Sequence, residues 1–159
     1  MRIALVGDAF PPLRSSGAVQ MRDLYLEFVK QGHHPTAILP SPELDCAWLI
    51  EQWNGGQTLR LKAPKTKDVG YIRRTIGEFL MPFAMLRNLR KSPMAKQRWD
   101  GVVWYSPTIF WGPLVKSLKK SSACRGYLII RDIFPKWALD IGLMGYGLPY
   151  LFFKFIEHF

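Results

Sequence analysis

The sequence has few residues of the kinds that build disulfide or metal frameworks. Its two cysteines, Cys46 and Cys124, lie far apart and do not have the spacing of metal ligands. The cysteines thus give no sign of a metal site, and a reduced cytosolic compartment is the simplest interpretation of their usage.

A long apolar run is also missing. The longest uncharged stretch near the end, residues 141–153, is shorter than the roughly 20 residues that a membrane-spanning helix needs. Residues 1–7 lack both the apolar core and the small-residue cleavage site of a signal peptide, so we expect none. Internal repeats and low-complexity tracts are absent too.

Acidic residues are scarce, with 12 against 22 lysines and arginines, so the net charge is +10. Half of the cations lie between Arg60 and Arg98. A one-sided basic region indicates an anionic partner, which could be lipid headgroups, phosphates or nucleic acid. The alternative is an ordinary solvated basic face.

What is present is a chain of 159 residues that is 48% hydrophobic, which is enough for one domain with a real core. The first forty residues predict a strand at 2–7, a loop at 8–17, a helix at 18–31 and a second strand from Thr36. Ser16 or Gly17 is expected to cap the helix, and Gly32 to follow its end.

The alternation of strands and helices continues to the end of the chain. The expected elements are a short edge strand at 58–62, a helix at 71–91 kinked or split by Pro82, a strand at 101–105, a helix at 108–120 capped by Thr108, a buried strand at 126–130 and a helix at 134–141. This order predicts an α/β fold with a doubly wound parallel sheet in a single domain.

Polar residues follow three of the predicted parallel strands, which places them on one rim of the sheet, where open α/β folds bind ligands. They are Ser15, Ser16 and Gly17 after the first strand, Ser106 after the strand at 101–105, and Arg131 and Asp132 after the strand at 126–130. Asp132 is the candidate acid/base or hydroxyl-binding carboxylate, with helix capping as the alternative role. Arg131 could serve an anionic group, and Asp8 could point into the same cleft.

The helix predicted at 71–91 has basic ends around an uncharged middle. The residues concerned are Arg73, Arg74, Phe79, Leu80, Phe83, Arg87, Arg90 and Lys91. This layout fits a segment lying in a membrane interface, and it fits equally a helix packed on the sheet with its charged ends reaching into water.

The chain resembles the amino-terminal domain of family 4 glycosyltransferases, which have the two-domain GT-B fold. It is most similar to the bacterial branch that builds O-antigen, capsule and colanic-acid-type polysaccharides. The resemblance rests on residues 2–24, 30–40, 99–114 and, above all, 127–144, which contain a strand, Arg-Asp, an aromatic-Pro pair and Gly. Residues 150–159 look like the start of the helix toward the interdomain region. Many members have paired glycines in the first loop, where this chain has Ser16 before a single Gly17.

The resemblance implies that residues 1–159 form the Rossmann-like acceptor half of a retaining glycosyltransferase, at the inner face of the cytoplasmic membrane. The acceptor would be a glycan on a polyprenyl diphosphate lipid. The donor would be a nucleotide-sugar, a co-substrate rather than a cofactor, bound mainly by a carboxy-terminal domain that is not in this sequence. Asp132 would lie near the reacting sugar, and Ser16 and Gly17 near the donor phosphate and the acceptor.

Because a GT-B site lies between two halves, we expect this chain alone to be inactive. It would then be a fragment, or one subunit of a split enzyme with its second domain supplied in trans. A rival function is a non-catalytic membrane-anchoring subunit. Another is a basic nucleic-acid-binding module, although no nucleic-acid-binding motif is present and no nucleic acid is expected to bind.

Overall fold

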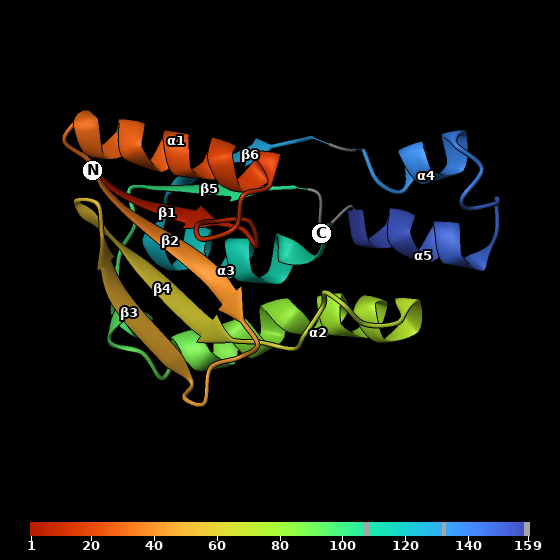
Figure 1. The fold of residues 1–159 in the computed structure, drawn as a ribbon, viewed down its shortest axis with the longest axis horizontal. Coiled ribbons are helices and arrows are strands. Elements are labelled where there is room, and N and C mark those ends of the chain that lie inside the picture. The colour runs from red at the N-terminus through yellow and green to blue at the C-terminus, as the bar shows by residue number, and fades with distance from the viewer. Residues whose placement is uncertain (107–108, 132, 158–159) are drawn as a thin grey trace.

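In the computed structural model, which describes residues 1–106, 109–131 and 133–157, strands and helices alternate along the chain (Figure 1). The elements are β1 (Arg2–Val6), α1 (Ser16–Lys30), β2 (His34–Ser41), β3 (Trp48–Trp53), β4 (Gly56–Lys62), α2 (Tyr71–Leu89), the 3-10 turn η1 (Pro93–Lys96), β5 (Gly101–Tyr105), the 3-10 turn η2 (Ile109–Trp111), α3 (Gly112–Ser122), β6 (Arg125–Ile129), α4 (Lys136–Asp140) and α5 (Leu148–Glu157).

The six strands form one sheet in the order β3-β4-β2-β1-β5-β6, in which every neighbouring pair except β3 and β4 is parallel. This confirms the predicted doubly wound α/β domain. One element was missed: β3 lies outside β4, so residues 58–62 belong to an interior strand and not to the expected edge strand. Asn54 and Gly55 join the two strands with positive φ angles of 41° and 86°, as a tight hairpin turn requires.

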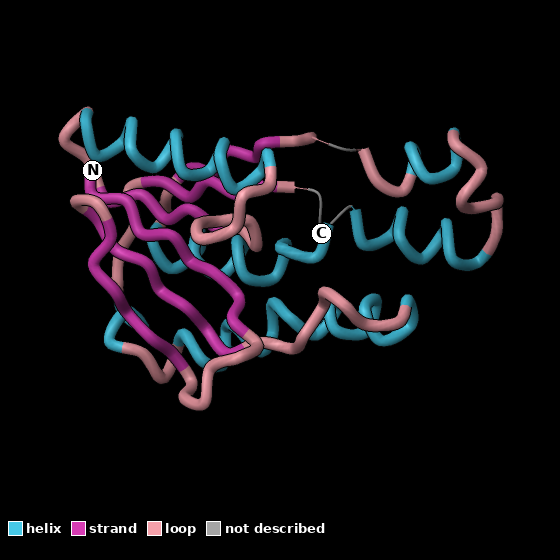
Figure 2. The backbone as a smooth tube through the Cα atoms, viewed as in Figure 1, coloured by secondary structure: helices cyan, strands magenta, loops and turns pink. Residues whose placement is uncertain are grey.

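Helices cover both faces of the sheet, with α1 on one face and α2 and α3 on the other (Figures 1 and 2). Successive side chains of β1 point to opposite faces. Leu5 therefore packs in the α1 layer with Tyr25, whereas Val6 packs in the second layer with Met85. All four side chains are fully buried, so the sheet is a rigid platform for the loops at its edge.

Two predicted helix details need correction. Ser15 caps α1, and not Ser16 or Gly17, because its hydroxyl oxygen accepts a hydrogen bond from the Ala18 amide at 3.3 Å. Pro82 does not split α2, which is one helix from residue 71 to 89 with buried residues on both sides of the proline. The predicted end of α1 is confirmed: Gly32 follows it with a φ of +74°. The expected cap Thr108 lies outside the described residues.

The strand expected to be buried at 126–130 is exposed. It is β6, the last strand of the sheet, and the side chains of Tyr127 and Leu128 are 68% and 39% exposed. Its apolar residues resemble those of an interior strand, but α4 and α5 extend past the carboxyl ends of the strands and do not cover β6 (Figure 1). The predicted helix at 134–141 is the shorter α4.

Candidate functional site

Arg131 joins two of the loops at the carboxyl edge of the sheet. Its Nη1 donates a hydrogen bond to Ser16 Oγ at 2.9 Å and another to Tyr105 Oη at 3.0 Å. The structure thus brings together Arg131 and Ser16, which the sequence placed on one rim, and adds Tyr105 from the end of β5. The guanidinium group is exposed at this edge, where it can meet an anionic ligand.

Gly17 allows α1 to lie against Tyr105. A Cβ atom at Gly17 would be 2.9 Å from Tyr105 Oη and 3.1 Å from Cε1, closer than packed atoms normally approach. Both residues are buried, so the glycine serves the contact between the helix and the ring. The hydroxyl of Ser15, which caps α1, already accepts a hydrogen bond from the Ala18 amide. Of the three neighbouring predicted site residues, Ser16 is the one whose side chain bonds to Arg131.

Ser106 lies on the opposite face of the sheet from Tyr105. Its amide donates to the Ile129 carbonyl oxygen at 3.0 Å, which continues the ladder between β5 and β6. The residue is buried and lines a cavity of about 760 Å³ between α3 and β6, together with Trp104 and Leu128. The shared rim that was predicted is present, but Ser106 is separated from the cluster around Arg131.

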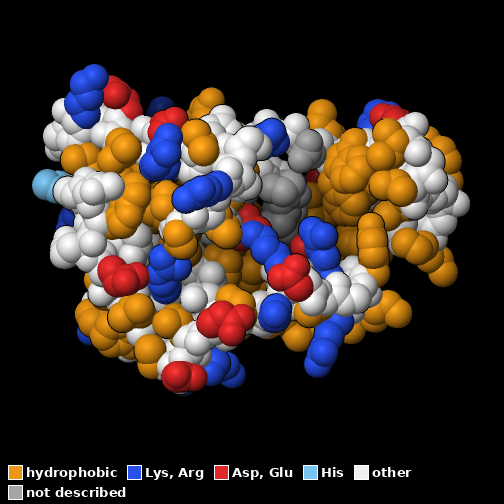
Figure 3. Space-filling model, in the orientation of Figure 1, with side chains coloured by type: hydrophobic (Ala, Val, Ile, Leu, Met, Phe, Trp, Pro, Cys, Tyr) orange, Lys and Arg blue, Asp and Glu red, His pale blue; other side chains and the backbone are white. Residues whose placement is uncertain are grey.

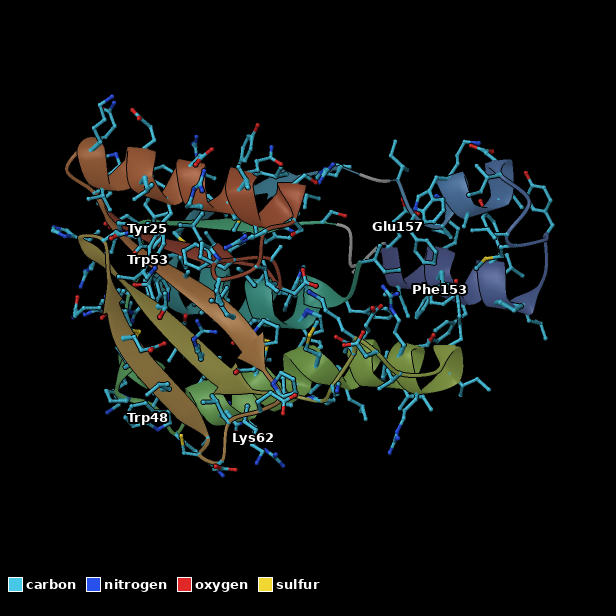
Figure 4. All side chains as sticks on the ribbon, viewed as in Figure 1. Tyr25, Trp48, Trp53, Lys62, Phe153 and Glu157 are labelled. Carbon is cyan, nitrogen blue, oxygen red and sulfur yellow. The ribbon has the colours of Figure 1, made fainter. Side chains whose placement is uncertain are left out.

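A second cavity, of about 320 Å³, lies between the start of α2 and the segment that follows β6. It combines polar and aromatic side chains. Its lining is Asp8, Tyr71, Arg74, Thr75, Glu78, Ile109, Phe110, Phe134, Trp137, Ala138, Leu143, Met144 and Phe153. Phe153, labelled on α5 in Figure 4, packs edge-on against Phe134 with ring centroids 4.9 Å apart. We call this space the rim cavity.

Two ion pairs hold the polar wall of the rim cavity. Lys67 Nζ lies 3.4 Å from Asp8 Oδ2 and also donates to the Asp8 carbonyl oxygen at 3.3 Å. Arg74 Nε donates to Glu78 Oε1 at 2.8 Å, and this hydrogen bond, helped by the carboxylate charge, raises the pKa of Arg74. Both carboxyl groups line the cavity, which therefore offers acceptors for hydroxyl groups.

The lining of the rim cavity combines aromatic faces with hydrogen-bond acceptors. It can therefore hold a ligand that presents both an apolar face and hydroxyl groups. Trp137 is 39% exposed and Asp8 is part-buried, so one wall offers an accessible indole and another a carboxylate. The predicted catalytic candidate Asp132, between Arg131 and Ile133, lies outside the described residues.

The outward face of α2 is apolar with basic ends. At about 100° per residue, Ile72, Ile76, Phe79, Leu80 and Phe83 fall on one side of the helix, and all are exposed. Four exposed cations flank this face toward the two ends of the helix: Arg73, Arg87, Arg90 and Lys91. Arg74 differs from the other predicted membrane residues, because it points to Glu78 and lines the rim cavity.

Helix α5 adds a second exposed apolar face beside the first. Its members are Leu148, Leu151, Phe152 and Phe155. The ring centroids of Phe79 and Phe152 lie 6.5 Å apart, so this face is continuous with that of α2. Hydrophobic side chains gather over the α4 and α5 end of the molecule in Figure 3. We call the combined area, from Ile72 to Phe83 and from Leu148 to Phe155, the α2–α5 surface.

Other kinds of site are not found within the described ranges. In residues 1–106, 109–131 and 133–157, no group of three or more His, Cys, Asp or Glu side chains could hold a metal ion. No helix in this part of the chain is both long and apolar enough to cross a membrane.

Sequence reasoning missed Tyr105 and Trp137 as site residues. Tyr105 ends an apolar strand and has the pattern of a core residue, although its hydroxyl reaches the rim. Trp137 lies only six residues beyond Arg131, and this closeness to a predicted site residue was the available signal.

Comparisons with known proteins agree with this fold. No protein-family model matches the chain, and no curated protein matches it in sequence. A solved structure described as the glycotransferase of kitacinnamycin is similar, with a TM-score of 0.54 and 16% identity. The match covers 88% of this chain and 34% of that one, so the chain spans about a third of its length. At this identity the likeness shows the fold alone, which is a Rossmann-like α/β domain.

Proposed function

We propose that the chain is the acceptor-binding half of a retaining family 4 glycosyltransferase of bacterial surface polysaccharide synthesis. The observation that carries the proposal is the rim cavity, at the carboxyl edge of a glycosyltransferase-like sheet, with carboxylates on one wall and aromatic rings on the other. The acceptor is a sugar on a polyprenyl diphosphate lipid, and a second domain binds the nucleotide-sugar donor.

Each part of the rim has a role in this proposal. Trp137 and Phe134 stack on the acceptor sugar, while Asp8 accepts hydrogen bonds from its hydroxyl groups. Arg131, held by Ser16 and Tyr105, meets a phosphate oxygen at the open side of the cleft. Asp132 is proposed as the carboxylate next to the reacting sugar.

Saturation-transfer NMR tests the acceptor role. We expect methyl glycosides, which carry no hydrocarbon chain, to receive saturation from the protein, and UDP- and GDP-sugars to receive little. Trp137→Ala should reduce the effect at least tenfold, because the main stacking platform is lost, whereas Trp48→Ala, on β3 away from the cavity, should leave it unchanged. Strong binding of the nucleotide-sugars with none of the glycosides would refute the proposal.

Transfer itself should need a second domain. Incubated alone with labelled UDP- or GDP-sugar and a lipid-linked acceptor, the chain should give no product, because a GT-B reaction takes place between two halves. Measurable turnover by this polypeptide alone would contradict the assignment of the donor to another domain.

We further propose that the protein works on an anionic membrane surface. The α2–α5 surface supports this, because exposed Phe79, Leu80 and Phe83 can enter the interface while Arg87 and Arg90 face lipid phosphates. The same surface is what favours the second candidate function, a non-catalytic anchoring subunit of a split glycosyltransferase. Co-purification of a separate donor-binding subunit from the source cell would favour that alternative.

Liposome sedimentation tests the membrane association. Vesicles with 30% phosphatidylglycerol should bind the protein, and phosphatidylcholine vesicles should bind it weakly. Each cation near an anionic surface contributes about 1 kcal/mol, so the double reversal Arg87→Glu with Arg90→Glu should lower binding by more than tenfold. The matched double reversal Arg22→Glu with Lys30→Glu, on α1, makes the same change in net charge and should matter little. Equal losses in both variants would show a general charge effect and no oriented surface.

A further inference from the structure

A third cavity, of about 430 Å³, opens between α2, α5 and the start of α3. Its wall is almost wholly apolar. It consists of Phe79, Pro82, Phe83, Ile109, Phe110, Gly112, Pro113, Lys116, Phe155 and Ile156. Of these described residues, Lys116 alone carries a charge. The volume is within the range of small-molecule sites, which is roughly 300–1,000 Å³.

The position of this cavity links it to the α2–α5 surface. Phe79, Phe83 and Phe155 belong to both, and their side chains are 41%, 48% and 63% exposed. An apolar chain lying along that surface can therefore enter the cavity between these rings without crossing water. A flat patch that only adsorbs to lipid would need no such hollow.

The charge at the cavity indicates which end of an amphiphile stays outside. Lys116 is exposed and also lines the neighbouring cavity between α3 and β6, where Lys119 and Lys120 lie one turn further along α3. Glu157 also lines that neighbouring cavity, but it is paired with Lys154 at 2.6 Å, so the three ammonium groups favour an anionic head over a neutral or cationic one. The apolar wall and this cation therefore fit one ligand class: a single hydrocarbon chain that ends in a phosphate.

We infer that the α2–α3–α5 cavity holds one hydrocarbon chain of a lipid phosphate, with Lys116 at its phosphate. The inference rests on the proposed function, since it assigns the lipid carrier of the acceptor to a discrete site beside the rim cavity. Ile109 and Phe110 line both spaces, so a bound chain would leave its head next to the place where the sugar is held.

Titration calorimetry with alkyl phosphates, below their critical micelle concentrations, tests this inference on the wild-type protein. Dodecyl phosphate should bind with one-to-one stoichiometry. Each methylene removed should weaken binding about fourfold, because burying one CH₂ contributes about that factor to an equilibrium constant. A neutral dodecyl oligoethylene glycol ether and the cationic dodecyltrimethylammonium should bind at least tenfold more weakly than the phosphate. Affinity that does not change with chain length, or is equal for the three heads, overturns the inference.

Two matched pairs of variants locate the site. Ile156→Trp should fill the cavity and abolish binding of dodecyl phosphate, whereas Leu151→Trp, on the exposed face of the same helix, should not. Lys116→Ala should weaken binding of dodecyl phosphate at least fivefold and Lys116→Arg should restore it, while Lys30→Ala, on α1 and outside the lining of this cavity, should have little effect. Binding that is unaffected by Ile156→Trp, in a variant with unchanged circular dichroism, refutes the assignment.

These probes carry no sugar, so the two proposals can fail separately. Loss of alkyl phosphate binding with intact glycoside binding at the rim cavity refutes the chain site alone. If the glycosides do not bind, but dodecyl phosphate binds and Ile156→Trp abolishes that binding, the acceptor role is refuted and the lipid site is retained.

Discussion

Substituting Gly17 by alanine tests the packing that positions the rim. Gly17 is the second residue of α1, and its missing side chain leaves room for the buried ring of Tyr105. An alanine Cβ would lie 2.9 Å from Tyr105 Oη and 3.1 Å from Cε1, so the ring or the helix must move by several tenths of an ångström. The hydroxyl that moves is the one that accepts from Arg131.

Two effects of opposite sign determine the size of the change. Alanine is favoured over glycine in a helix by up to about 1 kcal/mol. Forcing an extra methyl group into a packed core costs about 1–3 kcal/mol. A displaced Tyr105 also weakens its hydrogen bond with Arg131, but that residue is exposed, so we count no more than about 0.5 kcal/mol for it. The midpoints of these three terms sum to a net destabilisation of about 1–2 kcal/mol.

Urea unfolding followed by circular dichroism measures this change as a lower midpoint at constant slope. The substitution is repeated in a Tyr105→Phe background, where the closest oxygen is gone and the cost of the alanine should fall by at least half. Gly145→Ala is the control, since a Cβ there meets no atom within 4 Å. The reasoning is refuted if Gly17→Ala is neutral or stabilising, or if its cost in the Tyr105→Phe background equals its cost in the wild-type protein.

Three further predictions concern the core. Burial raises the pKa of Tyr25 from 10.0 to about 12, so the neutral hydroxyl stabilises the fold fully below pH 10. As the pH rises from 10 to 12, the free energy of unfolding should fall by up to about 1.4 kcal/mol per pH unit. Tyr25→Phe should remove this pH dependence in urea titrations. Gly56→Ala should cost at least about 2 kcal/mol by thermal unfolding, because its Cβ would lie 2.6 Å from the Pro35 carbonyl oxygen, a backbone atom that cannot turn away. Asn88→Ala should cost about 1–3 kcal/mol in urea, since the buried Asn88 Nδ2 donates to the Lys62 carbonyl oxygen at 2.7 Å; a change below about 0.5 kcal/mol would contradict this.

The parallel strands were predictable because a strand that is buried on both faces has a nearly continuous run of apolar residues. The run 101–105 is β5 without any change of bounds, and the run 2–7 is β1 with one residue fewer. β3 was missed although its signal was present: Asn54-Gly55 is the dipeptide that a tight hairpin prefers, and it lies between two runs with strand-forming residues. The exposure of β6 could not be predicted, because apolar composition does not say which strand ends the sheet.

The candidate site was predictable in its topology and not in its contacts. The position of Ser16 and Arg131 on one rim follows from strand order, since parallel strands end at the same edge. Their hydrogen bond, and the third partner Tyr105, depend on side-chain geometry that no spacing rule contains. The rim cavity needs α2, α4 and α5 to meet around Asp8, and contacts between such distant segments arise only in the folded chain.

The shared position of Ile109 has a consequence for how this protein can evolve. Its side chain lines the cavity beside β6, the rim cavity and the α2–α3–α5 cavity, so one substitution there alters three surfaces at once. Trp137 and Ile156 each line only one of these three spaces. During natural or directed evolution toward a new ligand, substitutions at Trp137 or Ile156 can therefore change one cavity at a time. A substitution at Ile109 changes all three cavities together. A library for altered specificity should vary the first two and hold Ile109 fixed.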